Sequence, residues 1–176
     1  MGKLARRFVI ASLVLGGNVV LSGCAVIYQQ AVAASRQPGE HIRTTPDKVW
    51  TELKCREREL PFVAVESMEL LPEMLKPGGR ANYRLVYAMC PRTPSQVLKA
   101  RVVRRILFKG DSVASNVNES LELKPGRWVV DSFFTMPKDA PLGVYSLEVT
   151  LEPPNQPAVQ RVRSFVLSDE FYLTGQ

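Results

Sequence analysis

Histidine is nearly absent, because the 176-residue chain contains a single one, His41. Nucleophilic hydrolysis of the triad type needs a base beside the nucleophile, and we expect His41 to lie exposed and unused in a tether. The chain also lacks a Gly-x-Ser-x-Gly elbow, a glycine-rich phosphate loop and a His-Glu-x-x-His motif. Carboxylate pairs and a lysine–serine pair stay open, since such pairs are assembled in space. We therefore expect no catalytic residues, no metal and no cofactor.

Long apolar runs are absent too. The longest one, residues 8–20, is 13 residues long and is interrupted at residues 16–18, whereas a membrane span needs roughly 20. It follows a short basic start that ends at Arg6 and Arg7. A basic start followed by a short apolar run is typical of a secretion signal.

The run ends in Leu21, Ser22, Gly23 and Cys24, which resembles the lipobox of bacterial lipoprotein precursors. The resemblance implies that residues 1–23 are a signal peptide and that the Cys24 thiol receives a diacylglyceryl group. The alternative is an ordinary cleaved signal with a chance cysteine. Acyl chains such as palmitate contribute about 0.8 kcal/mol per buried methylene, so several of them make a permanent anchor.

The residue after the cysteine is Ala25. In enteric-type sorting an aspartate at this position retains lipoproteins at the inner membrane. The resemblance therefore implies a protein of the cell envelope, anchored in the outer membrane and facing the periplasm.

Charge is modest once the signal is removed. Three of the 23 basic residues lie in residues 1–23, which leaves 20 against 17 acidic residues, a net charge of +3 over 153 residues. This length is enough for one domain with a real core. The charge does not indicate nucleic acid as a partner.

Cysteine is scarce, and with Cys24 acylated only Cys55 and Cys90 remain. Disulfides persist in the compartments outside the cytoplasm, and two thiols allow one intramolecular pairing. A metal or redox pair is the alternative, but it lacks both a Cys-x-x-Cys spacing and a neighbouring histidine. We expect a structural disulfide that pins the N-terminal segment to the edge of the domain.

The remaining pattern is that of an all-β domain. Residues 24–45 are expected to form a tether, and Thr45, Pro46 and Asp47 begin a short helix that buries Val49. From Pro61 onward, strand-length segments alternate with turn clusters, and residues 81–89 and 144–151 alternate apolar and polar side chains. We predict a disulfide-stapled antiparallel β-sandwich over residues 46–176.

The last two expected strands, residues 142–149 and 164–167, resemble the closing hairpin of bacterial immunoglobulin-like domains. In that family a tyrosine just inside the penultimate strand, here Tyr145, folds back on its own corner. The resemblance implies a sandwich of about seven strands. Cys55 and Cys90 do not occupy the inter-sheet positions of antibody domains.

The strand expected at residues 98–109 is unusually basic. Its odd positions, expected to face solvent, are Lys99, Arg101, Val103, Arg105, Leu107 and Lys109. One interpretation is an edge strand protected against aggregation by its cations. The other is a partner surface formed by Arg101, Val103, Arg105, Leu107 and Lys109.

These observations favour a non-catalytic, outer-membrane-anchored lipoprotein that binds an envelope protein or has a structural role in the envelope. The first alternative is a module that binds glycan or peptidoglycan, which requires exposed coplanar aromatic side chains on one face. The second is an envelope hydrolase, which requires a pocket with converging acids.

Overall fold

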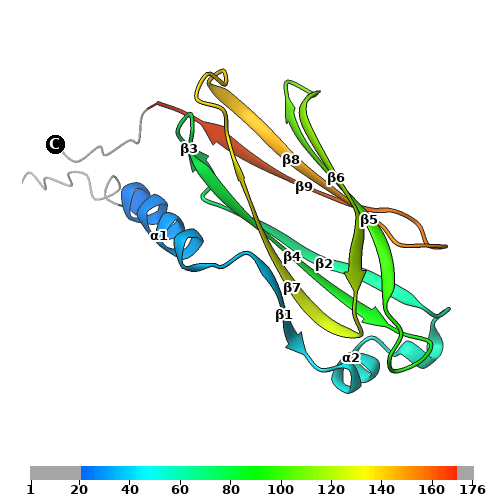
Figure 1. Ribbon diagram of the computed structural model, residues 1–176. Coiled ribbons are helices and arrows are strands. Elements are labelled where there is room, and N and C mark those ends of the chain that lie inside the picture. The colour runs from blue at the N-terminus through cyan, green and yellow to red at the C-terminus, as the bar shows by residue number, and fades with distance from the viewer. Residues whose placement is uncertain (1–20, 170–176) are drawn as a thin grey trace, which may run out of the picture.

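The computed structural model describes residues 21–169, which form a β-sandwich with two α-helices and one 3-10 helix (Figure 1). The elements in chain order are α1 (Leu21–Ser35), β1 (Gly39–Thr44), α2 (Pro46–Glu52), η1 (Cys55–Glu57), β2 (Phe62–Leu71), β3 (Met74–Leu75), β4 (Arg80–Cys90), β5 (Leu98–Phe108), β6 (Asp111–Leu123), β7 (Gly126–Thr135), β8 (Gly143–Glu152) and β9 (Val159–Leu167).

The strands form a four-stranded sheet of order β1-β7-β4-β2 and a five-stranded sheet of order β3-β9-β8-β5-β6. Every pairing is antiparallel except the short parallel contact of β3 with β9. The all-β sandwich is therefore confirmed. The described residues contain nine strands where about seven were expected, partly because β1 lies in the expected tether and β3 has only two residues.

The core lies between the two sheets. The alternating positions of β4 and β8 point into it, as the sequence predicts, since all eight side chains are buried: Tyr83, Leu85, Tyr87, Met89, Tyr145, Leu147, Val149 and Leu151. Burying one large apolar side chain stabilises a fold by about 1.5–3 kcal/mol. Sheet-on-sheet packing is thus the main source of stability.

Tyr145 closes the sandwich near the start of β8. Its hydroxyl donates a hydrogen bond to the carbonyl oxygen of Pro141 at 2.7 Å, which confirms the expected fold-back onto the preceding corner. Its ring stacks between Phe108 and Phe165, at centroid distances of 4.6 and 5.5 Å. Burial raises the pKa of Tyr145. The tyrosine thus joins β5, β8 and β9 at one corner.

The segment expected to be a tether is largely part of the domain. Strand β1 pairs with β7, from Gly39 opposite Asp131 to Thr44 opposite Arg127. The tether prediction for residues 24–45 is wrong in this part, because six of these residues complete a sheet. After β1, α2 begins at Pro46 with Thr45 as its N-cap and buries Val49, as predicted.

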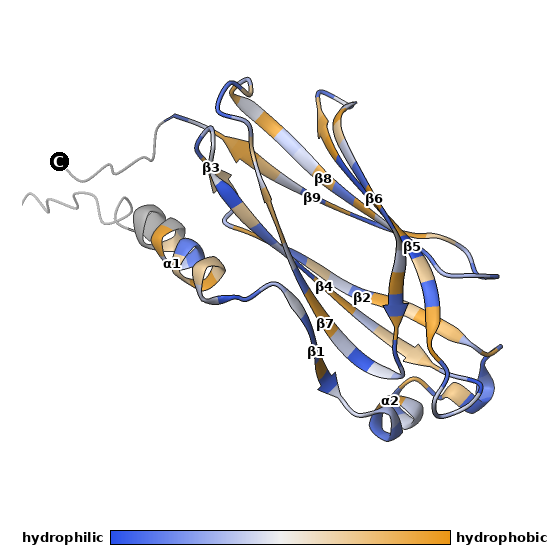
Figure 2. Ribbon diagram, viewed as in Figure 1, coloured by the Kyte–Doolittle hydropathy of each residue, from blue (hydrophilic) through white to orange (hydrophobic). Residues whose placement is uncertain are grey.

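Both helices lie on the side of the four-stranded sheet, whereas no helix covers the outer face of the five-stranded sheet in residues 21–169 (Figure 1). Helix α1 contacts β2, and α2 contacts β4 and β7. The hydropathy of the ribbon shows apolar segments on β5, β6, β8 and β9 beside polar ones (Figure 2). The two outer faces of the sandwich therefore differ in how much of their surface is covered.

Candidate functional site

The expected lipidation site falls at the start of the described residues. Leu21, Ser22, Gly23 and Cys24 are the first four residues of α1, and residues 1–20 of the expected signal lie outside the described residues. No helix between residues 21 and 169 is both long enough and apolar enough to cross a bilayer. Cys24 therefore lies in the first turn of α1, and this helix is attached to the domain.

Arg36, just after α1, makes this attachment. Its Nη1 donates to Oδ1 of Asn82 at 2.8 Å, and its Nη2 forms an ion pair with Glu69 at 2.5 Å. On the helix itself, Oε1 of Gln29 accepts a hydrogen bond from the backbone N–H of Glu73 at 3.1 Å, and Ala33 is buried. The helix is thus held against the domain at Gln29, in its middle, and at Arg36, just after its last residue.

A buried polar network underlies this contact. Arg84 donates to both carboxylate oxygens of Asp131, at 2.9 and 2.8 Å, and Nδ2 of Asn82 donates to the same carboxylate at 3.3 Å. Burial raises the pKa of Asp131, but the hydrogen bonds and charge of Arg84 and the amide of Asn82 outweigh it, so the pKa lies below its ordinary value. Asp131 is therefore held as a carboxylate.

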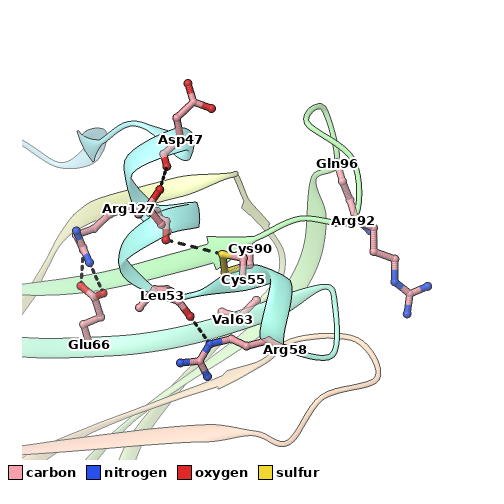
Figure 3. Close-up of a disulfide and its surroundings, with 12 residues drawn as sticks. Asp47, Leu53, Cys55, Arg58, Val63, Glu66, Cys90, Arg92, Gln96 and Arg127 are labelled. Atoms are coloured by element: carbon pink, nitrogen blue, oxygen red, sulfur yellow. Dashed lines mark hydrogen bonds and ion pairs between the residues drawn. A yellow bond between two sulfur atoms is a disulfide. The ribbon is translucent and has the colours of Figure 1, made fainter.

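The disulfide predicted between Cys55 and Cys90 is present, with the two Cα atoms 5.6 Å apart (Figure 3). Cys55 begins η1 and Cys90 ends β4. The bridge joins the helical segment to the end of an interior strand of the sheet, not to an edge strand.

Arg127 adds a second attachment for α2 at the disulfide end of the molecule. Its guanidinium pairs with Glu52 of α2 at 2.7 Å and with Glu66 of β2 at 2.6 Å. Figure 3 shows Arg127 beside Glu66. Hydrogen bonds and charge from Glu66 and Glu52 raise the pKa of Arg127. The segment of α2 and η1 is thus fixed by an ion pair at Glu52 and by the disulfide at Cys55.

Strand β5, the predicted basic strand, is an interior strand. It pairs with β8 on one side and β6 on the other, so the interpretation of β5 as a protected edge is wrong. The edge strands of this sheet are β6 and the two-residue β3. The sequence does not reveal this difference, because the pattern of a strand shows which face is buried but not which strands lie beside it.

Two cations of β5 are paired with carboxylates within the sheet. Arg101 and Arg105 point outward and are exposed, but Arg101 pairs with Glu152 at 3.0 Å and Arg105 with Glu148 at 2.9 Å, both from β8. Lys109 lies in the turn after β5, with Nζ 5.2 Å from the ring centre of Phe108. This face is therefore less positive than the sequence of β5 alone indicates.

The prediction that Val103 faces solvent is wrong. Val103 is on the outer face, opposite Thr150 of β8 and Val117 of β6, yet only 4% of it is exposed, because neighbouring strands flank it on both sides. Leu107 is half-buried on the same face.

The exposed apolar side chains of this face lie on the strands around β5. Val117 of β6 is 43% exposed and Val144 of β8 is 62% exposed, and Val162 of β9 also points outward. Val113 on β6 and Leu142 just before β8 are exposed near them. This set was not predicted from the sequence, although the period of two counted from Tyr145 in β8 and from Phe165 in β9 places Val144 and Val162 on the outer face.

A cavity of about 710 Å³ lies between the loops at the disulfide end. Glu57, Glu59, Arg58 and Arg92 are among its lining residues. Oε1 of Gln156 accepts a hydrogen bond from the backbone N–H of Val63 at 2.9 Å, while its Nε2 is buried without a protein partner. No three histidine, cysteine or acidic side chains gather as a metal site in the described part of the chain.

His41 lies on β1, opposite Val129, and is exposed. It was expected in a tether, and the structure places it in a strand of the four-stranded sheet instead. His41 lines a surface hollow together with Arg84 and Glu69.

No protein-family model matches the chain, and no curated protein matches it. Its fold is similar to part of a family 123 glycoside hydrolase from Clostridium perfringens, with 12% identity, 53% of this chain and 22% of that chain covered, and a TM-score of 0.43. It is also similar to the sporulation control protein Spo0M from Bacillus subtilis, with 14% identity, 61% and 50% covered, and a TM-score of 0.45.

A third similar structure is the alkylpurine DNA glycosylase AlkC from Pseudomonas fluorescens, with 13% identity, 66% of this chain and 33% of that chain covered, and a TM-score of 0.43. The chain spans half or less of the length of each of these three proteins. At these identities, the function has to be inferred from the residues of the chain itself.

Proposed function

We propose that this protein is a bacterial lipoprotein, anchored in the outer membrane through Cys24, whose immunoglobulin-like domain binds another envelope protein without catalysing a reaction. The lipobox-like residues Leu21–Cys24 and the basic, short apolar segment before them support the anchor. The disulfide between Cys55 and Cys90 is consistent with an oxidising compartment.

The closing hairpin supports the immunoglobulin-like assignment. Strands β8 and β9 pair in antiparallel register from Gly143 opposite Leu167 to Leu151 opposite Val159. The hydroxyl of Tyr145 binds the carbonyl oxygen of Pro141, four residues earlier, which is the local geometry expected of a tyrosine corner.

The outer face of the five-stranded sheet carries the proposal of protein binding. It bears the exposed side chains Val117 on β6, Val144 on β8 and Val162 on β9, which lie around the ion pairs of β5 with β8. An exposed apolar group framed by polar residues marks interaction sites on soluble proteins. The opposite sheet, by contrast, is covered in part by α1, which contacts β2, and by α2, which contacts β4 and β7.

The edge of the same sheet supports a protein partner. Strand β6 has 13 residues and contains three acidic residues but no lysine, arginine or proline, and lysine and proline are the residues that protect edge strands most often. An extended segment of a partner can add to such an edge through main-chain hydrogen bonds. A partner that adds to β6 would also cover Val117.

Aromatic side chains do not form the platform that glycan binding requires on this face. Among the exposed large hydrophobic side chains of the described residues, Tyr28 is the one aromatic, and it lies on α1. The protein-binding proposal therefore rests on aliphatic contacts and main-chain pairing.

The proposal is tested by placing a photo-crosslinking amino acid at Val117 or at Val144 in living cells. Arg43, exposed on β1 of the opposite sheet, is the matched control position. We expect one partner protein to be crosslinked at both sheet-face positions and not at Arg43. Crosslinking of that partner from Arg43 but from neither valine would contradict the proposed surface.

A further inference from the structure

Helix α1 has two chemically different sides. Positions 29, 32, 33 and 36 recur every three to four residues and therefore fall on one side of a helix, and positions 24, 27, 28 and 31 fall on another. The first set is buried or half-buried, whereas Ile27, Tyr28 and Ala31 are exposed. The helix thus presents one side to the domain and a second side away from it.

The domain-facing side is fixed by specific contacts. Gln29 binds the backbone of Glu73, Ala33 is buried, and Arg36 binds Asn82 and Glu69. These contacts lie along the helix and just past its end, so they determine how the helix is rotated. The direction in which Ile27 and Tyr28 face is therefore set by the domain.

The outward side is apolar where the anchor would be attached. Ile27 is 59% exposed and Tyr28 is 70% exposed. With a rise of about 1.5 Å per residue, positions 27 and 28 are only about 4.5–6 Å along the helix axis from position 24. A lipid on Cys24 places the bilayer surface next to this side of the helix.

We propose that the outward side of α1 rests on the lipid bilayer, so that the domain is held against the membrane in one orientation. This proposal depends on the proposed lipid anchor. Tyrosine has an apolar ring with a polar tip, which suits the boundary between acyl chains and headgroups. Helices that rest on a bilayer lie in the plane of the interface with their apolar side against the headgroup region. The part of the expected tether that forms α1 is then a membrane-contacting helix.

The test uses one introduced thiol in the full-length lipidated protein. Cys24 would be acylated and Cys55 is bridged to Cys90, so Ile27→Cys or Tyr28→Cys supplies a single reactive site for an environment-sensitive dye. Ser95→Cys, exposed in the loop after β4, is the matched control. The proteins are reconstituted into vesicles of phosphatidylethanolamine and phosphatidylglycerol that contain spin-labelled lipid.

We expect dyes at positions 27 and 28 to emit at shorter wavelength and to be quenched at least several-fold more by the spin-labelled lipid than the dye at Ser95. Equal quenching at all three positions would overturn the proposal. Shielding of positions 27 and 28 without lipid quenching, together with crosslinks between two copies, would also overturn it. Mass spectrometry of the Cys24 peptide reports separately on the anchor.

Discussion

Asn82 and Asp131 are polar residues inside a mostly apolar structure, and both are buried. A buried polar group is costly unless it is hydrogen-bonded. Here the Asn82 amide donates to Asp131 and to the carbonyl oxygen of Ser132 and accepts from Arg36, while Asp131 accepts from Arg84. The network therefore links the N-terminal helix to the two central strands of its sheet, β4 and β7.

Replacing Asp131 with asparagine should destabilise the fold by about 2–4 kcal/mol, because Arg84 loses a buried, charge-assisted partner. Urea unfolding at pH 7 measures this change. Glu152→Gln is the matched control, since its ion pair with Arg101 is exposed and worth about 1 kcal/mol or less. Equal losses in the two variants would show that burial does not strengthen the Asp131 pair.

The same carboxylate should make stability depend on pH. The folded-state pKa of Asp131 lies below the ordinary value, so its contribution is fully present above its unfolded pKa of about 4. The contribution is lost as the pH falls through the lower, folded-state pKa. In urea titrations from pH 7 to pH 2, the difference in stability between wild type and Asp131→Asn should therefore shrink below about pH 4.

Residues with a local signal could be predicted from the sequence, whereas residues defined by remote contacts could not. Tyr145 was predicted because its corner involves residues only four positions apart. Asn82 and Asp131 occupy the outward positions of alternating strands, which indicate solvent exposure. Their burial depends on Arg36, 46 residues from Asn82 in sequence, and on strand pairing that no local pattern reveals.

At the scale of elements, β5 and β6 show a second limit. The alternation of β5 correctly predicts an outward set of side chains, but Val103 in that set is buried because β6 and β8 lie on both sides. The pattern of β6 contains no signal for an edge position. The sandwich and the disulfide could thus be predicted, while the order of strands, and with it the exposed part of the candidate surface, could not.

Val103→Ala and Val117→Ala should show that the stability contributed by an outward-facing valine depends on how deeply its side chain is buried. The two residues lie opposite each other and differ mainly in exposure, 4% against 43%. We expect Val103→Ala to lose roughly 2 kcal/mol, from two buried methyl groups and the space they leave, and Val117→Ala about 1 kcal/mol or less. Chemical unfolding of both variants measures this, and a larger loss for Val117→Ala would contradict the described register.

The disulfide should stabilise the helical segment and β4 as one unit. Cys55→Ser and Cys90→Ser should each lower stability by roughly 2–4 kcal/mol, because each removes the same constraint on the unfolded chain. The double variant should be no less stable than either single one. Thermal unfolding of the three variants measures this, and additive losses would show that the two thiols act separately.

At the scale of the whole molecule, the proposed function gives the two outer faces of the sandwich different tasks. The four-stranded sheet carries α1, α2 and the polar network, and it therefore connects the domain to its expected anchor (Figure 1). Among residues 21–169, no helix covers the outer face of the five-stranded sheet and no further strand pairs with β6. A partner on this sheet would bind without disturbing the contacts that hold the N-terminal helix.

This division of tasks makes the anchor testable apart from the binding face. Cys24→Ala removes the thiol that would accept the diacylglyceryl group, so we expect no incorporation of labelled palmitate and retention of an unprocessed or mislocalised precursor. The measurement is fatty-acid labelling followed by separation of the inner and outer membranes. Continued labelling of Cys24→Ala would refute the anchor, whatever the partner of the domain.

Ala25→Asp is the matched control for this experiment, because it keeps the thiol and changes only the residue after it. The resemblance to enteric-type sorting implies that this variant incorporates palmitate as wild type does but stays in the inner membrane. Its disulfide should form normally, since Cys55 and Cys90 lie within the folded domain. Loss of labelling in both variants would instead indicate that the segment around Cys24 fails in export, and the two variants together therefore separate acylation from sorting.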